Sequence, residues 1–247
     1  MTATPNQAWR RLLDNQIAAA LKISLLIPQE SSPICNRCGN YNSLDHFEVC
    51  QQNKSINKQQ CGRHNHIRDK IFLAAQKDKT IIATKEPPLP EQPNIPNHRA
   101  DLKIRAPAGS AINHSYFGLH DIMVKDVLTA HTNNARLIAR NEGQQANITD
   151  ITTMARKIIQ AGLGVGVAQK ANTYRLHTAA GTKVTALLIS SAGTLHATFY
   201  KFLKKIFPDS TMRGSVLTDI AIGLIRARAN MYNHVYVLED GVADTQQ

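Results

Sequence analysis

Three cysteines and a histidine near the start of the chain have the residue types and the spacing of a metal site. Cys35 and Cys38 are separated by two residues, and His46 and Cys50 by three. A Cys-x2-Cys turn presents two thiolates to one ion, and residues at i and i+4 share one face of a helical turn. Zinc binds four nitrogen or sulfur donors in a tetrahedron. We therefore expect these four side chains to hold a structural zinc ion.

The sequence leaves the fourth ligand open. Three neighbouring candidates are Cys61, His64 and His66. Any of them could replace Cys50 or form a second site. Residues 1–21 contain charged residues that rule out the apolar core of a secretory signal. Cysteines in an intracellular protein are more often metal ligands than disulfides. We expect an intracellular protein with reduced cysteines.

A second group of polar residues has the composition of a metal-dependent phosphodiesterase centre. Asp101 begins one predicted strand, and Asp121 lies in the next. If these strands pair antiparallel, both carboxylates can reach one Mg²⁺ ion, which activates a water and polarises a phosphate. Lys170 and Tyr174 are four residues apart on a later predicted helix, so both can point to the same place. A lysine there would offset negative charge in the transition state.

Two other lysines compete for the catalytic role. Lys103 shares a strand face with Asp101, about 6.6 Å along the strand. Lys125 shares a face with Asp121 at about 13 Å, which is too far without a bend in the strand. Glu86, at the end of the preceding strand, is a candidate for a further metal ligand. The choice between these lysines and the helical one depends on the fold.

Both helices and strands are expected among the elements that must position these residues. Hydrophobic periodicity predicts helices over residues 8–26, 63–77, 151–161, 168–180, 195–207 and 215–230. The predicted strands cover residues 80–84, 101–105, 116–127 and 183–190. Thr149 and Asp150 are expected to cap the helix that begins at residue 151, and Gly162 to end it.

The pattern predicts two domains, one that folds around a metal ion and one that folds around a sheet. Residues 35–62 are polar and irregular, and such a segment usually needs a metal to fold. Residues 86–96 are rich in proline, which excludes a helix or a central strand. We expect a small helical, zinc-binding module over residues 1–62. A mixed α/β domain follows over residues 63–240, in which helices flank a sheet.

Charge restricts the class of partner. The 247 residues are 43% hydrophobic, enough for a core, and carry a net charge of +11. Such a charge favours polyanions, above all nucleic acid. No uncharged apolar run is long enough for a transmembrane helix, so no membrane partner is expected. We expect DNA as the partner, RNA as a second candidate, and no small-molecule cofactor. On this basic chain the cationic residues Arg63, His64 and Arg68 are expected to contact the nucleic acid.

The order of these motifs resembles the C-terminal part of non-LTR retrotransposon polyproteins. The resemblance covers residues 8–207. The motifs that carry it are Cys35-x2-Cys38, His46-x3-Cys50, Arg63-His64-Asn65-x-Ile67-x-Asp69, Glu86-Pro, Arg99-Ala-Asp101-Leu, Asp121-Ile-Met-Val, Lys170-x3-Tyr174 and Gly193. In that family a zinc knuckle and a restriction-enzyme-like endonuclease follow the reverse transcriptase.

The resemblance implies a PD-(D/E)XK-type, restriction-endonuclease-like core and a magnesium-dependent enzyme that nicks target DNA in the nucleus. Carried over, Asp101 and Asp121 hold the metal, and Lys170 and Tyr174 complete the catalytic centre. Two departures qualify this expectation. The family's usual proline before the first aspartate is Ala100 here, and no polymerase motif of the Tyr-x-Asp-Asp type is present. An inactive remnant, or a non-catalytic zinc-dependent nucleic-acid-binding module, is the alternative.

Overall fold

A computed structural model describes residues 11–24, 34–35, 38–39, 46–50, 54–89, 99–109, 115–125, 130–177 and 183–236. Over these ranges the chain forms a mixed α/β structure with a four-stranded sheet and seven helices, so the predicted α/β class is confirmed. The chain divides into two compact units. The first comprises residues 1–66 and 219–247, and the second comprises residues 67–218.

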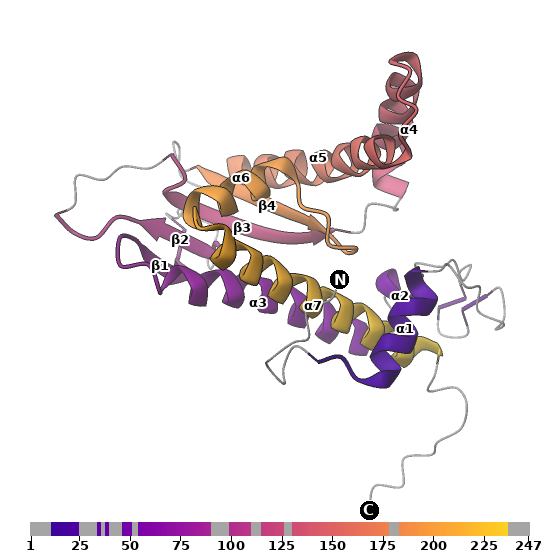
Figure 1. The fold of residues 1–247 in the computed structure, drawn as a ribbon, viewed down its shortest axis with the longest axis horizontal. Coiled ribbons are helices and arrows are strands. Elements are labelled where there is room, and N and C mark those ends of the chain that lie inside the picture. Colours follow the sequence, from indigo (N-terminus) through magenta and orange to yellow (C-terminus); the bar gives the residue numbers. More distant parts are fainter. Residues whose placement is uncertain are drawn as a thin grey trace, which may run out of the picture. The chain divides into compact units, whose positions relative to one another are not determined.

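The second unit contains the whole sheet (Figure 1). Its strands are β1 (Ile82–Lys85), β2 (Leu102–Arg105), β3 (Gly118–Lys125) and β4 (Val184–Ser190). They lie in the order β1-β2-β3-β4, with the first two pairings antiparallel and the last one parallel. A parallel pair needs a long crossover connection. Two helices supply it here, α4 (Ala130–Gln145) and α5 (Ile151–His177).

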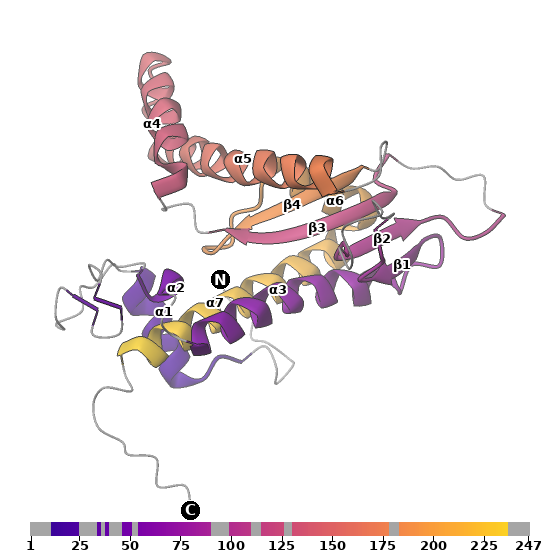
Figure 2. The same cartoon turned by 180° about the vertical axis from the view of Figure 1, so that it is seen from behind.

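The two faces of the sheet carry different helices. Successive strand residues point to opposite faces, and neighbours on β3 illustrate this. Asp121 contacts Tyr174 of α5, whereas the ring of His120 lies 4.4 Å from that of Phe202 on α6 (Ala197–Ile206). Figure 2 shows α5 and α6 on opposite sides of β4. Residues 119, 121 and 123 therefore share one face of β3 and point toward α5.

Apolar side chains pack α5 onto this face in two clusters. The first consists of Leu163, Ala186 and Leu188, with Met123, Ile159 and Val167 against them. The second consists of Leu89, Ala100 and Tyr174, with Leu119 and Val184 against them. On α5, residues 159, 163, 167, 170 and 174 follow helical spacing along one stripe. The stripe is apolar at first and ends in the two polar candidates for the catalytic site.

The prediction that Gly162 ends a helix is wrong. α5 continues through Gly162 and two further glycines up to His177. Its N-terminus is as predicted, because the Asp150 carboxylate accepts a hydrogen bond of 2.7 Å from the backbone N–H of Thr153. A Cβ on Gly166 would lie 2.3 Å from Leu188 Cδ2. Close packing on the sheet therefore requires this glycine, and its packing outweighs its weak helix propensity.

Other helices differ in extent from the prediction. The expected irregular segment is wrong for residues 54–62, which open the helix α3 (Lys54–Ala75). The last helix, α7 (Ser210–Tyr236), is longer at both ends than predicted, and α4 was not predicted. Parts of the predicted helices at residues 8–10, 25–26 and 178–180, of the proline-rich loop at 90–96 and of the strand at 126–127 lie outside the described residues.

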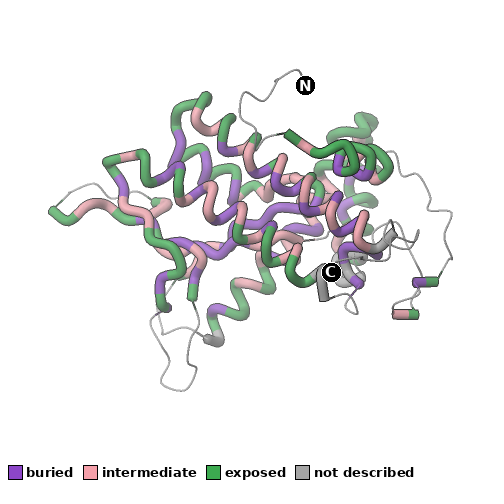
Figure 3. Tube along the Cα trace, turned by 90° about the horizontal axis from the view of Figure 1, so that it is seen from below, coloured by how far each residue is buried: buried purple, intermediate pink, exposed green. Residues whose placement is uncertain are grey.

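The first unit is helical. It contains α1 (Asp14–Ser24), the single turn α2 (His46–Val49), the first part of α3 and the second part of α7. Its buried core consists of Ala19, Cys35, Phe47, Cys50, Ala229, Met231 and Tyr232. Buried positions alternate with exposed ones along the helices (Figure 3). No helix among the described residues combines the length and the apolar character needed to span a bilayer.

Two glycines of α5 allow a matched test of its packing. Gly166→Ala should destabilise the chain by about 1–3 kcal/mol, because the new methyl group overlaps Leu188. Gly164→Ala should be neutral or stabilise by up to about 1 kcal/mol, since a Cβ there meets nothing within 4 Å. Urea unfolding of the full chain measures both. Equal unfolding midpoints for the two variants would contradict this account of α5.

Candidate functional site

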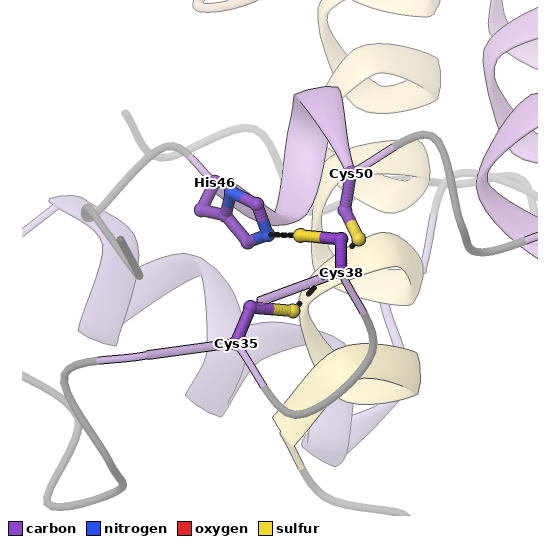
Figure 4. A group of neighbouring side chains, drawn as sticks. All are labelled: Cys35, Cys38, His46 and Cys50. Atoms are coloured by element: carbon purple, nitrogen blue, oxygen red, sulfur yellow. Dashed lines mark hydrogen bonds between the residues drawn. The ribbon is translucent and has the colours of Figure 1, made fainter. Parts of the chain in front are cut away.

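The four predicted zinc ligands of the first unit lie together (Figure 4). Their ligand atoms are all within 4.8 Å of one another. Cys35 Sγ lies 3.9 Å from Cys50 Sγ, and Cys38 Sγ lies 3.2 Å from His46 Nε2. In a tetrahedral zinc site with metal–sulfur bonds of about 2.3 Å, two sulfurs are about 3.8 Å apart. The cluster therefore has the size and the donor set to hold a metal ion such as zinc.

Two local structures bring these ligands together. The backbone N–H of Gly39 donates a 2.8 Å hydrogen bond to the Cys35 carbonyl, with Gly39 at φ +71°. Glycine adopts this left-handed conformation without steric cost, so the turn brings Cys38 back toward Cys35. The helical turn α2 presents the other two ligands, since Cys50 N–H donates to the His46 carbonyl at 2.9 Å. The first turn comes from Cys-x2-Cys-Gly, and the second from His-x3-Cys.

Cys50 is the fourth member of the cluster. It is 1% exposed, and the other candidates point elsewhere. Cys61 is exposed on α3, and His66 Nε2 contacts the backbone carbonyl of Asp219 at 3.0 Å. His64 Nδ1 lies 3.2 Å from Asn65 Oδ1. Cys35 and Cys50 do not form a disulfide with each other, because their 3.9 Å separation far exceeds the about 2.05 Å of an S–S bond.

A buried carboxylate anchors α2 beside the ligands. Glu48 is 2% exposed and accepts hydrogen bonds from Arg63 of α3 at 3.0 Å and Arg228 of α7 at 2.6 Å. A buried charge is tolerated only when it is paired in this way. The aromatic ring of Phe47, next in the chain, stacks edge-on against Tyr232 at 5.6 Å. Sequence reasoning missed the role of Arg228, which lies 180 residues from Glu48.

In the second unit, three of the four predicted catalytic residues are in direct contact. The Tyr174 hydroxyl donates a 2.6 Å hydrogen bond to Asp121 Oδ1. Lys170 Nζ forms an ion pair of 2.9 Å with Asp121 Oδ2. The Asp121 side chain is 9% exposed and that of Lys170 30% exposed. The helical spacing of Lys170 and Tyr174 on α5 thus brings a cation and a hydroxyl group to the two oxygens of one carboxylate.

Asp101 borders this group from the neighbouring strand. It directly precedes β2, and its Oδ2 accepts a 2.5 Å hydrogen bond from the backbone N–H of Ile122. Its own N–H donates to the His120 carbonyl at 3.0 Å. Burial, then the charge of Asp121 and its hydrogen bond, and then the charge of Asp101 raise the pKa of the Tyr174 phenol. Tyr174 therefore stays protonated and acts as a hydrogen-bond donor.

The competing lysines have other environments. Lys103 is exposed on β2, where the residues on either side of it are buried. Lys125 Nζ donates a 2.9 Å hydrogen bond to Gln169 Oε1. Lys170 forms the 2.9 Å ion pair with Asp121. The structure thus answers, on geometry, which lysine lies at the carboxylate.

The predicted nucleic-acid contacts Arg63 and Arg68 point inward. Their side chains are 6% and 9% exposed. Arg63 pairs with Glu48, and Arg68 with Asp69 at 3.1 Å and with Glu86. In this arrangement both guanidinium groups bind carboxylates of the protein.

Asp101 and Asp121 offer carboxylate oxygens, the ligand type that Mg²⁺ takes. Across the described ranges, the group of three or more candidate ligands is the one at Cys35, so no third carboxylate joins Asp101 and Asp121. Mg²⁺ usually keeps several waters and is held by one or two carboxylates plus a phosphate. The donor set is therefore compatible with Mg²⁺, provided that water and substrate complete the coordination.

Comparisons with known proteins do not place the chain in a family. No protein-family model and no curated protein matches it. The interpretation of both sites therefore depends on their geometry and on the chemistry of their residues.

Two cysteines provide a matched test of the metal cluster. Cys50→Ser should lose most of the about one zinc ion per chain expected for a four-ligand site, because one of four donors is replaced by a weak one. Cys61→Ser should retain the metal, since Cys61 is exposed outside the cluster. Elemental analysis of the purified proteins measures the zinc content. Zinc loss in the Cys61 variant with retention in the Cys50 variant would reverse the ligand assignment.

His120 predicts a loss of stability in acid. Burial lowers its pKa from 6.5 to about 4, against the opposing effect of its hydrogen bond to the Tyr116 carbonyl. Between these two values the unfolded chain binds a proton that the folded chain does not. Stability should fall by up to about 3 kcal/mol as the pH falls from 6.5 to about 4.

The variant His120→Leu isolates this contribution, because it has no titrating group at that position. Its unfolding midpoint in urea should fall less between pH 7 and pH 4.5 than that of the wild type. Other titrating groups cancel in this comparison between two proteins. An equal fall in both would show that His120 does not couple folding to pH.

Proposed function

We propose that this chain is a metal-dependent DNA endonuclease that nicks a target strand, related to the C-terminal region of non-LTR retrotransposon polyproteins. The observation that carries the proposal is the contact of Lys170 and Tyr174 with Asp121, beside Asp101. These positions follow the order that the resemblance implies: one aspartate at the start of a strand, a second on the next strand, and a lysine on a following helix.

The roles of the residues follow from their contacts. Asp101 and Asp121 would hold Mg²⁺, which when bound lowers the pKa of a coordinated water and polarises the phosphate. Tyr174 orients Asp121 by donating to its Oδ1. Lys170 neutralises Asp121 and is partly exposed, so it can also interact with an incoming phosphate. Hydrolysis forms a bond from the water oxygen to phosphorus and breaks the bond to the leaving oxygen, which takes up a proton.

Charge on the helix that carries the lysine supports a polyanionic substrate. α5 has four lysine or arginine residues, Arg156, Lys157, Lys170 and Arg175, and no aspartate or glutamate. Lys157 forms an ion pair with Glu142, so it is not counted among the charges that a substrate would meet. The chain as a whole carries +11. Such a surface attracts the phosphate backbone through long-range electrostatics and counterion release. DNA as substrate and the nucleus as location are part of this proposal.

A second candidate is a zinc-dependent nucleic-acid-binding module without catalysis, such as an inactive remnant would be. Two observations favour it. The metal cluster of the first unit is completely assembled, whereas both oxygens of Asp121 already contact Tyr174 and Lys170. A carboxylate engaged in this way is a complete structural interaction without any metal.

A plasmid-nicking assay in Mg²⁺ distinguishes the two candidates. Wild type should convert supercoiled plasmid to the nicked form, and Asp121→Asn should lose activity by at least about 100-fold, because the charge that holds the metal is gone. Lys170→Ala should lose a similar factor. Lys157→Ala is the matched control, since Lys157 is on the same helix, is 34% exposed and forms an ion pair with Glu142 at 3.1 Å.

The outcomes separate cleanly. Equal nicking by wild type and Asp121→Asn would mean that Asp121 has no catalytic role and would exclude this active site. Salt-sensitive DNA binding by a folded wild type that does not nick would support the second candidate instead. A loss in Lys157→Ala equal to that in Lys170→Ala would point to general charge rather than to a specific role of Lys170.

A further inference from the structure

A second surface of the sheet unit has the residues for binding nucleic acid, on the face of the sheet opposite Asp121. It is the outer side of α6. The inner side of this helix is defined by its buried residues Phe199, Phe202, Leu203 and Ile206. Its outer side carries Ala197, Tyr200, Lys201 and Lys204, which follow helical spacing along one face. Because the apolar side of α6 packs inward, the ring of Tyr200 is exposed on the outer side, beside Lys201 and Lys204.

The exposed ring has no role in the core. Tyr200 is 45% exposed, and Lys204 Nζ lies over its ring, 5.9 Å from the centroid. This cation–π contact holds the lysine beside the ring. α6 contains three lysines and no acidic residue. Within the described ranges, Lys201 and Lys204 form no ion pair with a carboxylate. The surface therefore combines uncompensated positive charge with a flat apolar face.

Helix stability explains only part of this pattern. Lysines in the last turn of a helix interact favourably with the negative end of its dipole, which accounts for Lys204 and Lys205. It does not account for Lys201 or for an exposed tyrosine one turn earlier. An aromatic ring next to lysines is the arrangement by which proteins bind single-stranded nucleic acid, because the base stacks on the ring while the cations bind the backbone.

We propose that Tyr200, Lys201 and Lys204 form a binding site for single-stranded nucleic acid, with one base stacked on Tyr200 and the phosphates on the lysines. A single strand is favoured over a duplex because paired bases are not available to stack on an external ring. The site does not depend on the proposed cleavage. Asp121 and α5 lie on the opposite face of the sheet, so substitutions on α6 leave Lys170 and Tyr174 in place.

Binding of the full chain to a labelled thymidine 20-mer, followed by fluorescence anisotropy without added Mg²⁺, tests the proposal. Tyr200→Ala should weaken binding about 5- to 100-fold, the range of one lost stacking interaction. Tyr200→Phe should bind as wild type because it retains the ring. The double variant Lys201→Ala, Lys204→Ala should also lower the slope of log affinity against log salt by about 1.4, since each phosphate contact contributes about 0.7.

Controls separate this site from the proposed nuclease and from other partners. Lys157→Ala removes a paired lysine from the opposite face and should leave the affinity unchanged. Asp121→Asn should not weaken binding to the 20-mer, even though it abolishes nicking if the nuclease proposal is correct. Circular dichroism confirms folding of each variant.

Three results would overturn the proposal. One is that the double variant Lys201→Ala, Lys204→Ala has the same affinity and the same salt slope as the wild type. Another is equal affinity of Tyr200→Ala and wild type for the 20-mer. The third is loss of binding to anionic phospholipid vesicles in the lysine variant while oligonucleotide binding is retained, which would assign the surface to a membrane.

Discussion

The carboxylate of Asp121, buried between the sheet and α5, sets the arrangement of the second unit. A charge at a helix–sheet interface must be compensated, because burial without a partner is costly. Among the described residues, α5 supplies this compensation through Lys170 and Tyr174. These two residues continue the apolar stripe of the helix, so hydrophobic packing and ion pairing require the same rotation of α5. Gly166, one turn before Lys170, lets the helix approach closely enough for the contact.

The first unit is organised by a different buried charge. Glu48 lies between Arg63 and Arg228, and the same helical turn carries the ligands His46 and Cys50. The metal cluster, the aromatic contact of Phe47 and this pair of arginines therefore stabilise one short segment. Four residues of helix are too few to be stable alone. Their order depends on the side chains that hold them against α3 and α7, and metal binding would add to it.

The two positively charged regions of the second unit have different characters. Lys170 is partly buried and, with Tyr174, contacts the carboxylate of Asp121, an arrangement that could position one reacting phosphate. The outer side of α6 is exposed and carries a ring beside free cations, which suits extended binding along a strand. An endonuclease that acts while a single strand is held nearby would use both, whereas a non-catalytic module would need only the second. Arg63 and Arg68, which were predicted to contact nucleic acid, instead pair with carboxylates of the protein.

The sequence by itself determined three of the four residues of the cysteine–histidine cluster and the positions of the strands along the chain. Ligand types at short spacings report local geometry, which is why Cys35, Cys38 and His46 could be named without a fold. The choice of Cys50 over Cys61, His64 and His66 depended on the tertiary structure. Alternation and β-branched runs similarly located the four strands to within a few residues. Tertiary structure decided what depends on contacts distant in the chain. These are the continuity of α5 through its glycines, the choice of Lys170 over Lys103 and Lys125, the pairing of Glu48 with Arg228, and the inward direction of Arg63 and Arg68. Local propensity cannot predict them, because each is determined by a partner that only folding brings into contact.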